Sequence, residues 1–508
     1  MGTGRFIVRT VSQFVLSGAV GLCLALGGLS DGAKAASGGG ALAAARKALR
    51  SDAVNTLQYV GSGTWNLFGQ SPSPSAPDPQ FEMTSYTADI NYVTGASHVV
   101  MIRSPALITR VLLTNARQIR AEEYVRGDVS WIIGPPGGPG TGLAPANVPE
   151  QKNAEERYME IWATPHGFLR AAAAHHAVSR AVKGGTEVTF RDGRHRFVGH
   201  INARHEVTHI RTWIDSPVLG DMPCDAIFTD YRDFDGWRFP GHVVRTMGGK
   251  TRLDMKVTSV KVNLPVDIVT PEPMRIAMAA PVRTSSDVLA PGVYWIRGFQ
   301  WHSVVIDQGD HIVVVDAPLD EARSNAVIAK AKELIPNKPI RYLVNTHAHF
   351  DHAGGVRTYV DEGATIVTMP VNRAYYERIW KTPHTIRPDR LQMSGKAAKF
   401  LPITDGKVVL NDPIRPVEVY HQQGTGHNVA MAIAYLPKEK ILIQVDGWNT
   451  EAIGAPKPQL ANPYIVNLND NIQRLQLDVA QIVPLHGPRT GTMAELIELT
   501  KLPRGALN

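Results

Sequence analysis

A dense group of ligand-type side chains directly follows a predicted strand in the carboxy-terminal half of the 508-residue chain. The run 346–355 reads Thr-His-Ala-His-Phe-Asp-His-Ala-Gly-Gly. His347 and His349 are two positions apart, so an extended or turning chain aims both rings at one cation. Asp351 and His352 follow at once, in position to serve a second cation. Imidazole and carboxylate are the ligands that zinc takes where no thiolate is available, so the run predicts a metal site.

Three further candidate ligands also stand at the ends of predicted strands or turns. His427 follows a glycine-rich turn, Asp446 ends an apolar strand, and His486 ends another. Because open α/β sheets build their sites just beyond strand ends, we expect these three side chains to converge on the first group.

The surrounding pattern is that of an α/β domain. Residues 304–306 and 312–315 are short apolar runs typical of buried strands, and residues 321–334 have a helical pattern. Strand, helix and strand at this spacing indicate a sheet covered by helices.

On these motifs, residues 290–508 resemble the metallo-β-lactamase-fold superfamily of binuclear metallohydrolases. The resemblance implies an α/β fold, an αββα sandwich with the metals at one sheet edge. It implies that Asp446 is a bridging carboxylate and that Asp316 supports a ligand. It also implies that the ligands of the first metal are His347, His349 and His427. Those of the second metal are Asp351, His352 and His486. One subclass of true β-lactamases, which residues 348–355 also resemble, lacks the bridging carboxylate, so Asp446 argues against that activity.

The predicted function is that of an exported, zinc-dependent hydrolase with two Zn²⁺ per chain; Fe or Mn are alternative metals. A hydroxide bridging two divalent ions is ionised near neutral pH, because coordination lowers the pKa of water from about 15.7 to about 7. Asp351 is the expected catalytic residue, since it lies beside that hydroxide and can orient it and shuttle its proton. The expected target is an ester, lactone or amide bond of a small molecule.

Other functions remain compatible with the sequence. The same fold serves phosphodiester and sulfate ester hydrolases, β-lactamases and iron-dependent oxidoreductases. The complete second trio favours two metals and hydrolysis over the oxidoreductase. A further alternative is a lipid- or acyl-binding protein in which the metal domain is accessory.

Residues 372–400 lie between the second and third ligand motifs, and we expect them to overhang the metals. Lid packing is the commoner role for any single residue of such a segment. Asn428 is either a hydrogen-bond donor to an oxyanion or the cap of its turn. Trp295 and Trp301 are expected in the core or the pocket wall. The other candidate substrate contacts are Tyr375, Tyr376, Trp380, His384 and Arg387.

Residues 36–264 predict a β-rich domain, because most of them alternate apolar and polar side chains. A helix is predicted over 157–182 and a Pro/Ser-rich loop over 71–79. Residues 230–263 resemble the curved antiparallel sheet of periplasmic lipoprotein-carrier proteins. The proline-containing segment 265–288 is the predicted linker to a catalytic domain over residues 289–508.

Residues 1–35 have the features of a secretory signal peptide. Arg5 and Arg9 precede the apolar stretch 14–29, and Ala33-Lys34-Ala35 has the small-x-small form of a cleavage site. An uncleaved anchor is the alternative, although 14–29 is short for a spanning helix. The expected location is periplasmic or secreted, with no stable membrane span after signal removal.

The composition of the chain limits which metal sites and binding partners are expected. Of two cysteines, Cys23 lies in the predicted signal, so Cys224 alone remains, which excludes an internal disulfide and a cysteine-rich metal site. The formal net charge is +7, but no basic run or aromatic-interleaved basic stripe occurs, so nucleic acid is not an expected partner. The expected partner is a small-molecule substrate, and the oligomeric state stays open.

Overall fold

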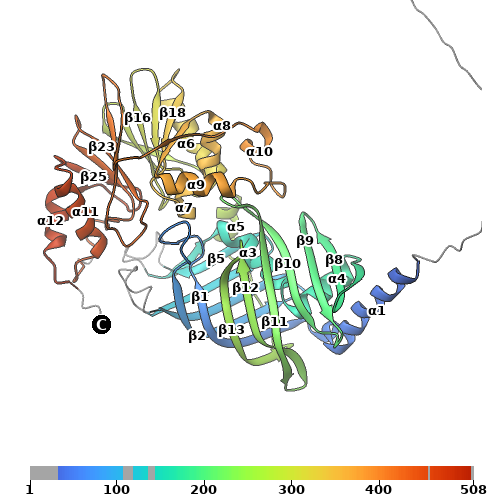
Figure 1. Cartoon of the computed structure of the whole chain (residues 1–508). Coiled ribbons are helices and arrows are strands. Elements are labelled where there is room, and N and C mark those ends of the chain that lie inside the picture. Colours follow the sequence, from blue (N-terminus) through green and yellow to red (C-terminus); the bar gives the residue numbers. More distant parts are fainter. Residues whose placement is uncertain (1–31, 107–117, 135–143, 456–457, 505–508) are drawn as a thin grey trace, which may run out of the picture.

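The computed structural model describes residues 32–106, 118–134, 144–455 and 458–504. An amino-terminal β-rich part is followed by a carboxy-terminal α/β part (Figure 1). Residues 1–31 of the predicted signal lie outside the described residues, and residues 32–35 begin helix α1 (Gly32–Ala48). No helix within the described ranges has both the length and the apolar character needed to cross a membrane.

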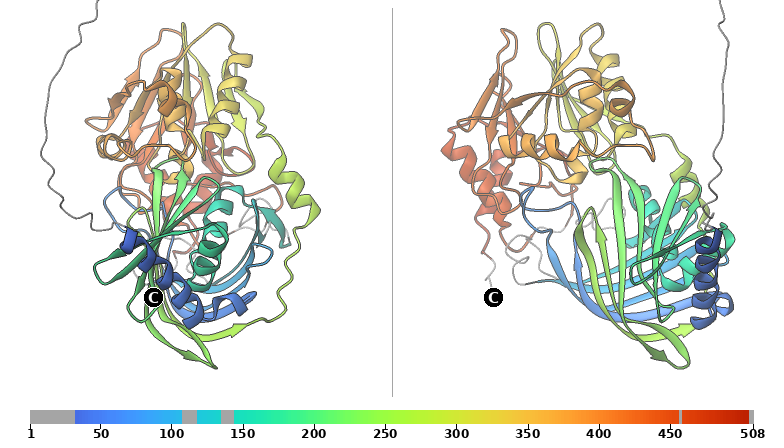
Figure 2. Two further views of the ribbon diagram at one scale, coloured as in Figure 1. Left: turned by 90° about the vertical axis from the view of Figure 1, so that its right-hand side faces the viewer. Right: turned by 45° about the vertical axis from the view of Figure 1, so that its right-hand side comes forward.

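The amino-terminal part is one antiparallel sheet of 13 strands, in the order β6-β5-β4-β3-β2-β1-β13-β12-β11-β10-β9-β8-β7. The sheet curls around α3 (Ala154–Trp162) and α4 (Pro165–Ala174), as Figure 2 shows, so the predicted curved antiparallel sheet is confirmed. Its strands are β1 (Thr56–Asn66), β2 (Gln80–Asn91), β3 (Ala96–Pro105), β4 (Ile119–Arg126), β5 (Val129–Gly134), β6 (Ala146–Pro149), β7 (Val178–Val182), β8 (Gly185–Asp192), β9 (His195–Asn202), β10 (Val207–Ser216), β11 (Gly220–Phe234), β12 (Trp237–Met247) and β13 (Lys250–Val262).

Alternation along the strands turns one face of this sheet toward the helices. Phe81 and Met83 of β2 are buried while their sequence neighbours are exposed. Phe168 of α4 lies directly over Gly199 of β9, where a Cβ atom would stand 2.2 Å from its ring. Apolar burial between helix and sheet therefore holds the amino-terminal part together.

The helix predicted over 157–182 is wrong at its carboxyl end. The helical segment stops at Ala174, and His176 adopts a left-handed conformation with φ of 50°. Residues 178–182 then form β7, which pairs with β8 at the edge of the sheet. The available strand edge outweighed the local helical preference of the alanine-rich segment.

The carboxy-terminal part contains two mixed sheets. The first has the order β14-β15-β16-β17-β18-β19-β20 and the second the order β21-β22-β23-β24-β25-β26. Their strands are β14 (Ser285–Ala290), β15 (Val293–Arg297), β16 (Ser303–Asp307), β17 (Ile312–Val315), β18 (Ile340–Val344), β19 (Thr365–Thr368), β20 (Lys399–Pro402), β21 (Lys407–Leu410), β22 (Val417–His421), β23 (Ala432–Leu436), β24 (Ile441–Gln444), β25 (Gln481–Pro484) and β26 (Gly491–Thr492).

Helices cover the outer faces of both sheets, which confirms the predicted αββα sandwich (Figure 1). In β17, Val313 and Val315 point into the core between the sheets, whereas Ile312 and Val314 face the helices. A strand buried on both faces explains the continuous apolar run. The helices are α6 (Glu321–Leu334), α7 (Phe350–Ala353), α8 (Val356–Glu362), α9 (Pro370–Ile379), α10 (Arg390–Ser394), α11 (Pro463–Arg474) and α12 (Met493–Thr500).

The two parts touch directly. The predicted linker, residues 265–288, contains α5 (Glu272–Ala279) and the start of β14. Outside this linker, a hydrogen bond also connects the two parts: the Asp221 amide of β11 donates to the Pro383 carbonyl at 2.8 Å. The connection between β1 and β2 reaches α7, where the Phe350 amide donates to the Gly69 carbonyl at 3.1 Å. A loop of the amino-terminal sheet therefore lies beside the strand ends that carry the candidate ligands.

Candidate metal centre

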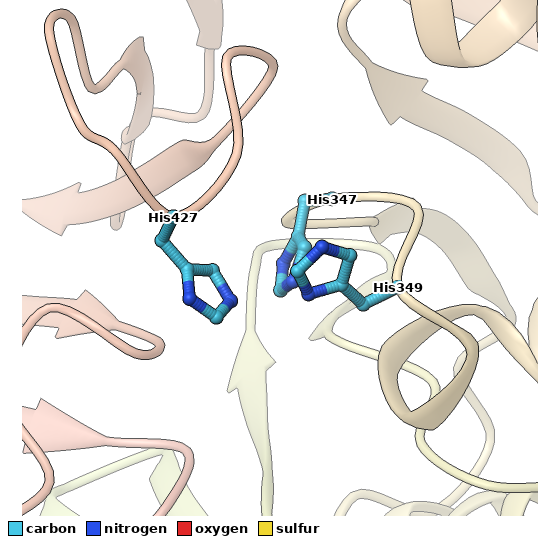
Figure 3. A group of neighbouring side chains, drawn as sticks. All are labelled: His347, His349 and His427. Atoms are coloured by element: carbon cyan, nitrogen blue, oxygen red, sulfur yellow. The ribbon is translucent and has the colours of Figure 1, made fainter. Parts of the chain in front are cut away.

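His347, His349 and His427 form the first cluster of candidate ligands. The first two lie in the short loop between β18 and α7, and the third lies between β22 and β23. One ring nitrogen of each lies within 4.8 Å of those of the other two. Figure 3 shows the three rings turned toward one another from two separate loops. Strand ends of both sheets thus supply one three-imidazole cluster.

Asp351, His352 and His486 form the second cluster. Asp351 and His352 belong to α7, and His486 follows β25. Asp351 Oδ2 is 3.4 Å from His352 Nε2 and 3.7 Å from His486 Nε2. One carboxylate and two imidazoles therefore face a common point.

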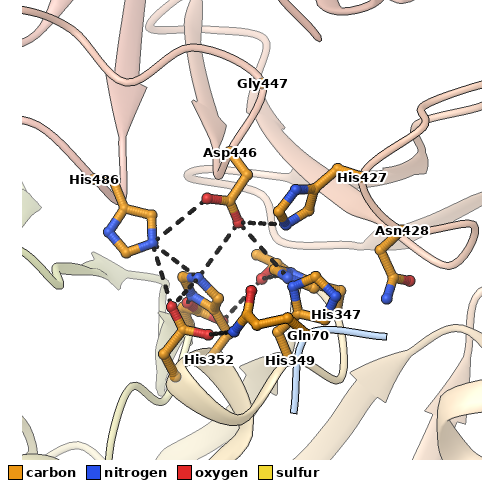
Figure 4. Close-up of polar contacts among 12 residues, drawn as sticks. Gln70, His347, His349, His352, His427, Asn428, Asp446, Gly447 and His486 are labelled. Carbon is orange, nitrogen blue, oxygen red and sulfur yellow. Dashed lines mark hydrogen bonds and ion pairs between the residues drawn. The ribbon is translucent and has the colours of Figure 1, made fainter. Parts of the chain in front are cut away.

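Asp446 lies between the two clusters, just beyond the end of β24. Its Oδ2 atom is 3.2 Å from His427 Nε2, 3.6 Å from His347 Nε2 and 3.4 Å from His352 Nε2. Its Oδ1 atom is 3.5 Å from His486 Nε2 (Figure 4). The residue has φ of 56°, a left-handed conformation that aspartate tolerates better than most residues. Its carboxylate contacts both clusters, as expected of a bridging group.

Asp316 orients the ring of His352 from the buried side of the site. Its Oδ2 atom accepts a hydrogen bond from His352 Nδ1 at 2.6 Å, and its Oδ1 atom accepts one from the Thr346 hydroxyl at 2.9 Å. The carboxylate is fully buried. Because Nδ1 carries the donated proton, Nε2 faces the ligand cluster, which is the supporting role expected of this residue.

Burial and neighbouring charges set the protonation states. Burial, aided by the neighbouring imidazoles, holds the pKa of His347 well below its ordinary value and lowers the pKa of His349 to about 3. Burial acts to raise the pKa of Asp446, but the imidazoles of His427 and His486 hold it well below the ordinary value. His347 and His349 are therefore neutral and Asp446 is ionised, the forms that bind a cation.

The inward-facing atoms fit divalent cations. Four of them make no hydrogen bond to any described residue although they are buried: His347 Nε2, His349 Nδ1, His427 Nε2 and Asp446 Oδ2. Such groups are costly to bury unless a ligand satisfies them. The donors are imidazole nitrogens and carboxylate oxygens, which suit zinc. The Cys224 thiol lies in β11, outside the clusters.

The clusters are open on one side. The side chains of Asp351, His427 and His486 are 21%, 15% and 14% exposed, whereas those of His347 and His352 are at most 1% exposed. On the His349 side, the cavity that His349 lines has a volume of only about 20 Å³. That space holds about one water molecule. The surface that these ligands still expose therefore belongs mainly to Asp351, His427 and His486.

Two of the candidate substrate residues support the site from within the fold. Tyr376 is fully buried, and its hydroxyl donates to Asn345 Oδ1 at 2.8 Å. Asn345 in turn donates to the His347 carbonyl at 2.9 Å. Trp380 stacks on the Tyr376 ring. The structure therefore places Tyr376 and Trp380 beneath the ligand loop and not over the metals, because the helix α9 packs its aromatic face inward.

His384 and Arg387 lie at the contact between the two parts of the chain. His384 is buried and faces Gly220 of β11. Arg387 is 3.9 Å from the carboxylates of Glu155 and Asp215. Both differ from the expected substrate-facing position, because their segment turns toward the amino-terminal sheet.

Tyr375 and Asn428 do border the centre, since both line the small cavity beside His349. The Asn428 amide donates to the Ser71 carbonyl at 3.1 Å, and its Oδ1 atom accepts from the Ala430 amide at 2.9 Å. The contact to Ala430 caps the turn that contains Asn428, and the contact to Ser71 joins this turn to the loop between β1 and β2.

Sequence reasoning missed two donors to Asp351. Trp301 Nε1 donates to Asp351 Oδ2 at 3.1 Å, and Gln70 Nε2 donates to Oδ1 at 2.7 Å. Trp301 was expected only in a core or wall, and Gln70 precedes a segment recognised only as a loop. No local pattern distinguishes either residue, because each acts on a carboxylate far away in the sequence.

Comparisons with known proteins agree with this picture. Residues 296–443 match the metallo-beta-lactamase superfamily. A linear primary-alkylsulfatase from Pseudomonas sp is 33% identical over 72 residues, which are 14% of this chain and 11% of that protein. An (R)-specific secondary-alkylsulfatase from Pseudomonas sp is 33% identical over 73 residues, with the same coverage. The chain thus spans only about a tenth of the length of these curated relatives.

A solved metallo-beta-lactamase, FIM-1 from Pseudomonas aeruginosa, is similar with a TM-score of 0.32 and 21% identity. The similarity covers 43% of this chain and 93% of that one. The family match lies on the αββα sandwich and includes both halves of the first ligand cluster. The carboxy-terminal part of this chain thus has the metallo-beta-lactamase fold, and residues 296–443 within it match the family model of that superfamily.

Proposed function

We propose that this protein is a hydrolase that uses two divalent metal ions to cleave an ester-type bond of a small molecule. The observation that carries the proposal is the position of Asp446, whose carboxylate contacts both ligand clusters. Its Oδ2 atom and the neighbouring Nε2 atoms of His347 and His427 make no hydrogen bond to any described residue. His347, His349 and His427 would hold the first ion. Asp351, His352 and His486 would hold the second ion.

Zinc is the ion that we propose, because all donors are imidazole or carboxylate; iron and manganese accept the same donors. Bound divalent ions supply Lewis acidity toward the scissile bond and make water nucleophilic near neutral pH. The side chains around the metals contribute to the reaction through their positions. Asp351 and His486 are partly exposed and lie 3.7 Å apart, so a substrate that reaches the centre would meet these two side chains.

Asp351 is the proposed catalytic residue. Burial acts to raise the pKa of its carboxyl, but the imidazoles of His352 and His486 hold that pKa well below the ordinary value. The ionised carboxylate accepts a hydrogen bond from the attacking water and relays its proton to the leaving group. Trp301 donates to Oδ2 and Gln70 to Oδ1, so the orientation of this carboxylate is defined.

Two substrate classes are supported to different degrees. The first is a carboxylic ester, lactone or amide, as the resemblance to the superfamily leads us to expect. The second is an alkyl sulfate ester, which the two alkylsulfatase relatives favour over their short matched segments. Asp446 argues against a β-lactam substrate, because the subclass of β-lactamases with a similar motif has no bridging carboxylate there.

Metal removal tests the mechanism. Purified protein is treated with a chelator, assayed on ester, lactone, β-lactam, phosphodiester and alkyl sulfate substrates, and assayed again after Zn²⁺ is restored. We expect loss and recovery of one hydrolytic activity together with two bound ions per chain. His427→Ala should abolish that activity, whereas His175→Ala, which replaces an exposed histidine at the end of α4, should retain it. Full activity of the metal-free protein contradicts the proposal.

We also propose that the protein is exported to the periplasm or secreted, on the basis of residues 1–35. Mass determination of protein recovered from the envelope or medium should give a chain that begins at Ala36. A chain that still begins at Met1 contradicts cleavage.

A further inference from the structure

The loop between β1 and β2, residues 67–79, is hydrogen-bonded to both segments that carry the first cluster. The Phe350 amide donates to the Gly69 carbonyl at 3.1 Å, next to His349. On the other segment, the Val429 amide donates to the Pro72 carbonyl at 2.9 Å, two residues after His427. This loop of the amino-terminal sheet thus joins the two segments that carry the first cluster, and Figure 4 shows Gln70 of the loop among the candidate ligands.

One contact of this loop selects the ring nitrogen that His349 presents. His349 Nε2 donates to the Ser71 carbonyl at 2.8 Å. A carbonyl only accepts, so Nε2 carries the proton and Nδ1 has a free lone pair. Nδ1 is buried without a hydrogen-bond partner among the described residues. The Ser71 carbonyl therefore prepares Nδ1 of this ring for a cation.

A second contact acts on the other cluster. Gln70 Nε2 donates to Asp351 Oδ1 at 2.7 Å. The other oxygen, Oδ2, lies 3.4 Å from His352 Nε2. The side-chain amide of Gln70 thus fixes Oδ1, while Oδ2, which also accepts a hydrogen bond from Trp301 Nε1, faces the second cluster.

The loop itself is held in place by the amino-terminal sheet. Lys250 Nζ of β13 donates to the Ser71 hydroxyl at 2.6 Å and lies 3.3 Å from Asp78 Oδ1. The Ser71 hydroxyl donates to the same Asp78 oxygen at 2.6 Å. At Gly69, where φ is 80°, a Cβ atom would stand 2.6 Å from the Phe350 ring, so only glycine permits this approach.

We propose that the amino-terminal sheet completes the metal centre through Gln70 and Ser71, which position Asp351 and His349 without touching the ions. The inference rests on the proposed two-metal function. Hydrogen-bond partners of metal ligands typically change metal affinity by about 10–100-fold when they are lost. The loop is therefore part of the hydrolytic site, although it lies far from the ligands in sequence.

Gln70→Leu in the full-length chain tests the contact to Asp351. Chelated protein is titrated with Zn²⁺ against a chromophoric competitor, and metal content is measured after dialysis. We expect affinity for one of the two ions to fall by about 10-fold or more while the other is retained. Gln58→Leu is the matched control, because Gln58 Nε2 makes a similar 2.8 Å hydrogen bond to Asp89 within the amino-terminal sheet. Equal affinities for Gln70→Leu and Gln58→Leu would overturn the proposal.

Gly69→Ala tests the position of the loop as a whole. The added methyl group meets the Phe350 ring, so we expect weaker binding of both ions. Gly184→Ala is the control, since Gly184 has φ of 86° and no atom within 4 Å of an added Cβ. It reproduces the backbone strain without the clash. If both glycine variants bind two ions as tightly as the wild type, the loop has no positioning role.

The two hypotheses fail in different ways. Wild-type protein that binds no divalent ion and hydrolyses none of the substrates refutes the proposed function. Wild-type protein that binds two ions and hydrolyses a substrate, together with variants that bind them equally well, refutes only the role of the loop. If Gly69→Ala does not fold, the comparison of Gln70→Leu with Gln58→Leu decides alone.

Discussion

Replacing Asp316 by asparagine should weaken binding of the second ion without removing any ligand. The side chain keeps its shape, and asparagine tolerates the left-handed backbone at this position, where φ is 70°. What changes is the charge that accepts the hydrogen bond of His352 Nδ1 at 2.6 Å. The variant therefore isolates the contribution of one buried carboxylate.

The size of the effect follows from these contacts. A hydrogen bond to a charged group contributes about 1.5–3 kcal/mol, against about 0.5–1.5 kcal/mol for a neutral one. Exchanging one for the other at His352 should lower the free energy of unfolding of the metal-free protein by about 1–2 kcal/mol. Affinity for the ion bound by His352 should fall by about 10–100-fold.

Urea unfolding of chelated protein and competitive Zn²⁺ titration measure the two quantities. Asp287→Asn serves as the control, because that exposed carboxylate pairs with Arg297 at 3.2 Å on the surface. A pair of this kind contributes at most about 1 kcal/mol and has no path to the metals. If Asp316→Asn binds both ions with wild-type affinity, the orientation of His352 by Asp316 has no importance for the centre.

Three further predictions concern other parts of the molecule. Asp446→Ala should lower the affinity for both ions by more than the factor of about 10–100 that is typical when a hydrogen-bond partner of a ligand is lost. Retention of either ion in a metal assay would contradict the bridging role of Asp446. Trp301→Phe removes the donor to Asp351 Oδ2 and should lower kcat by about 10-fold, or 1.4 kcal/mol, with KM unchanged; an unaltered kcat in steady-state kinetics would exclude this effect. Burial lowers the pKa of His166 to about 4 in the folded protein, so the unfolded chain binds the proton first as the pH falls from about 6.5 to 4, and stability is lost over that window. The loss amounts to roughly 3 kcal/mol, and urea unfolding of His166→Gln should show a flatter pH profile than wild type.

Much of the carboxy-terminal fold could be predicted because its signals are local. The apolar runs that become β16 and β17 are buried on both faces, so hydrophobicity alone reveals them. The ligands follow strand ends, and strand ends of an α/β sandwich meet at one edge. By contrast, the alanine-rich part of the 157–182 segment favours a helix, and pairing with the edge of β8 made residues 178–182 a strand.

The substrate-facing residues were predicted poorly for a related reason. A lid segment can point its aromatic side chains inward or outward with the same sequence pattern. Tyr376 turned inward because Asn345, beneath the ligand loop, accepts its hydroxyl proton. Arg387 turned toward carboxylates of α3 and β10 in the amino-terminal part. Both outcomes depend on neighbours contributed by distant segments.

The sequence by itself determined the residue types of the metal centre and the α/β fold that gathers them, since both are encoded in short-range spacing and apolar periodicity. Only the tertiary structure decided which nitrogen of His349 faces the centre, and that Gln70 holds a carboxylate 281 positions further along the chain. The physical reason is that a hydrogen bond between distant segments requires both to be packed in place, and no local pattern in either segment records its partner.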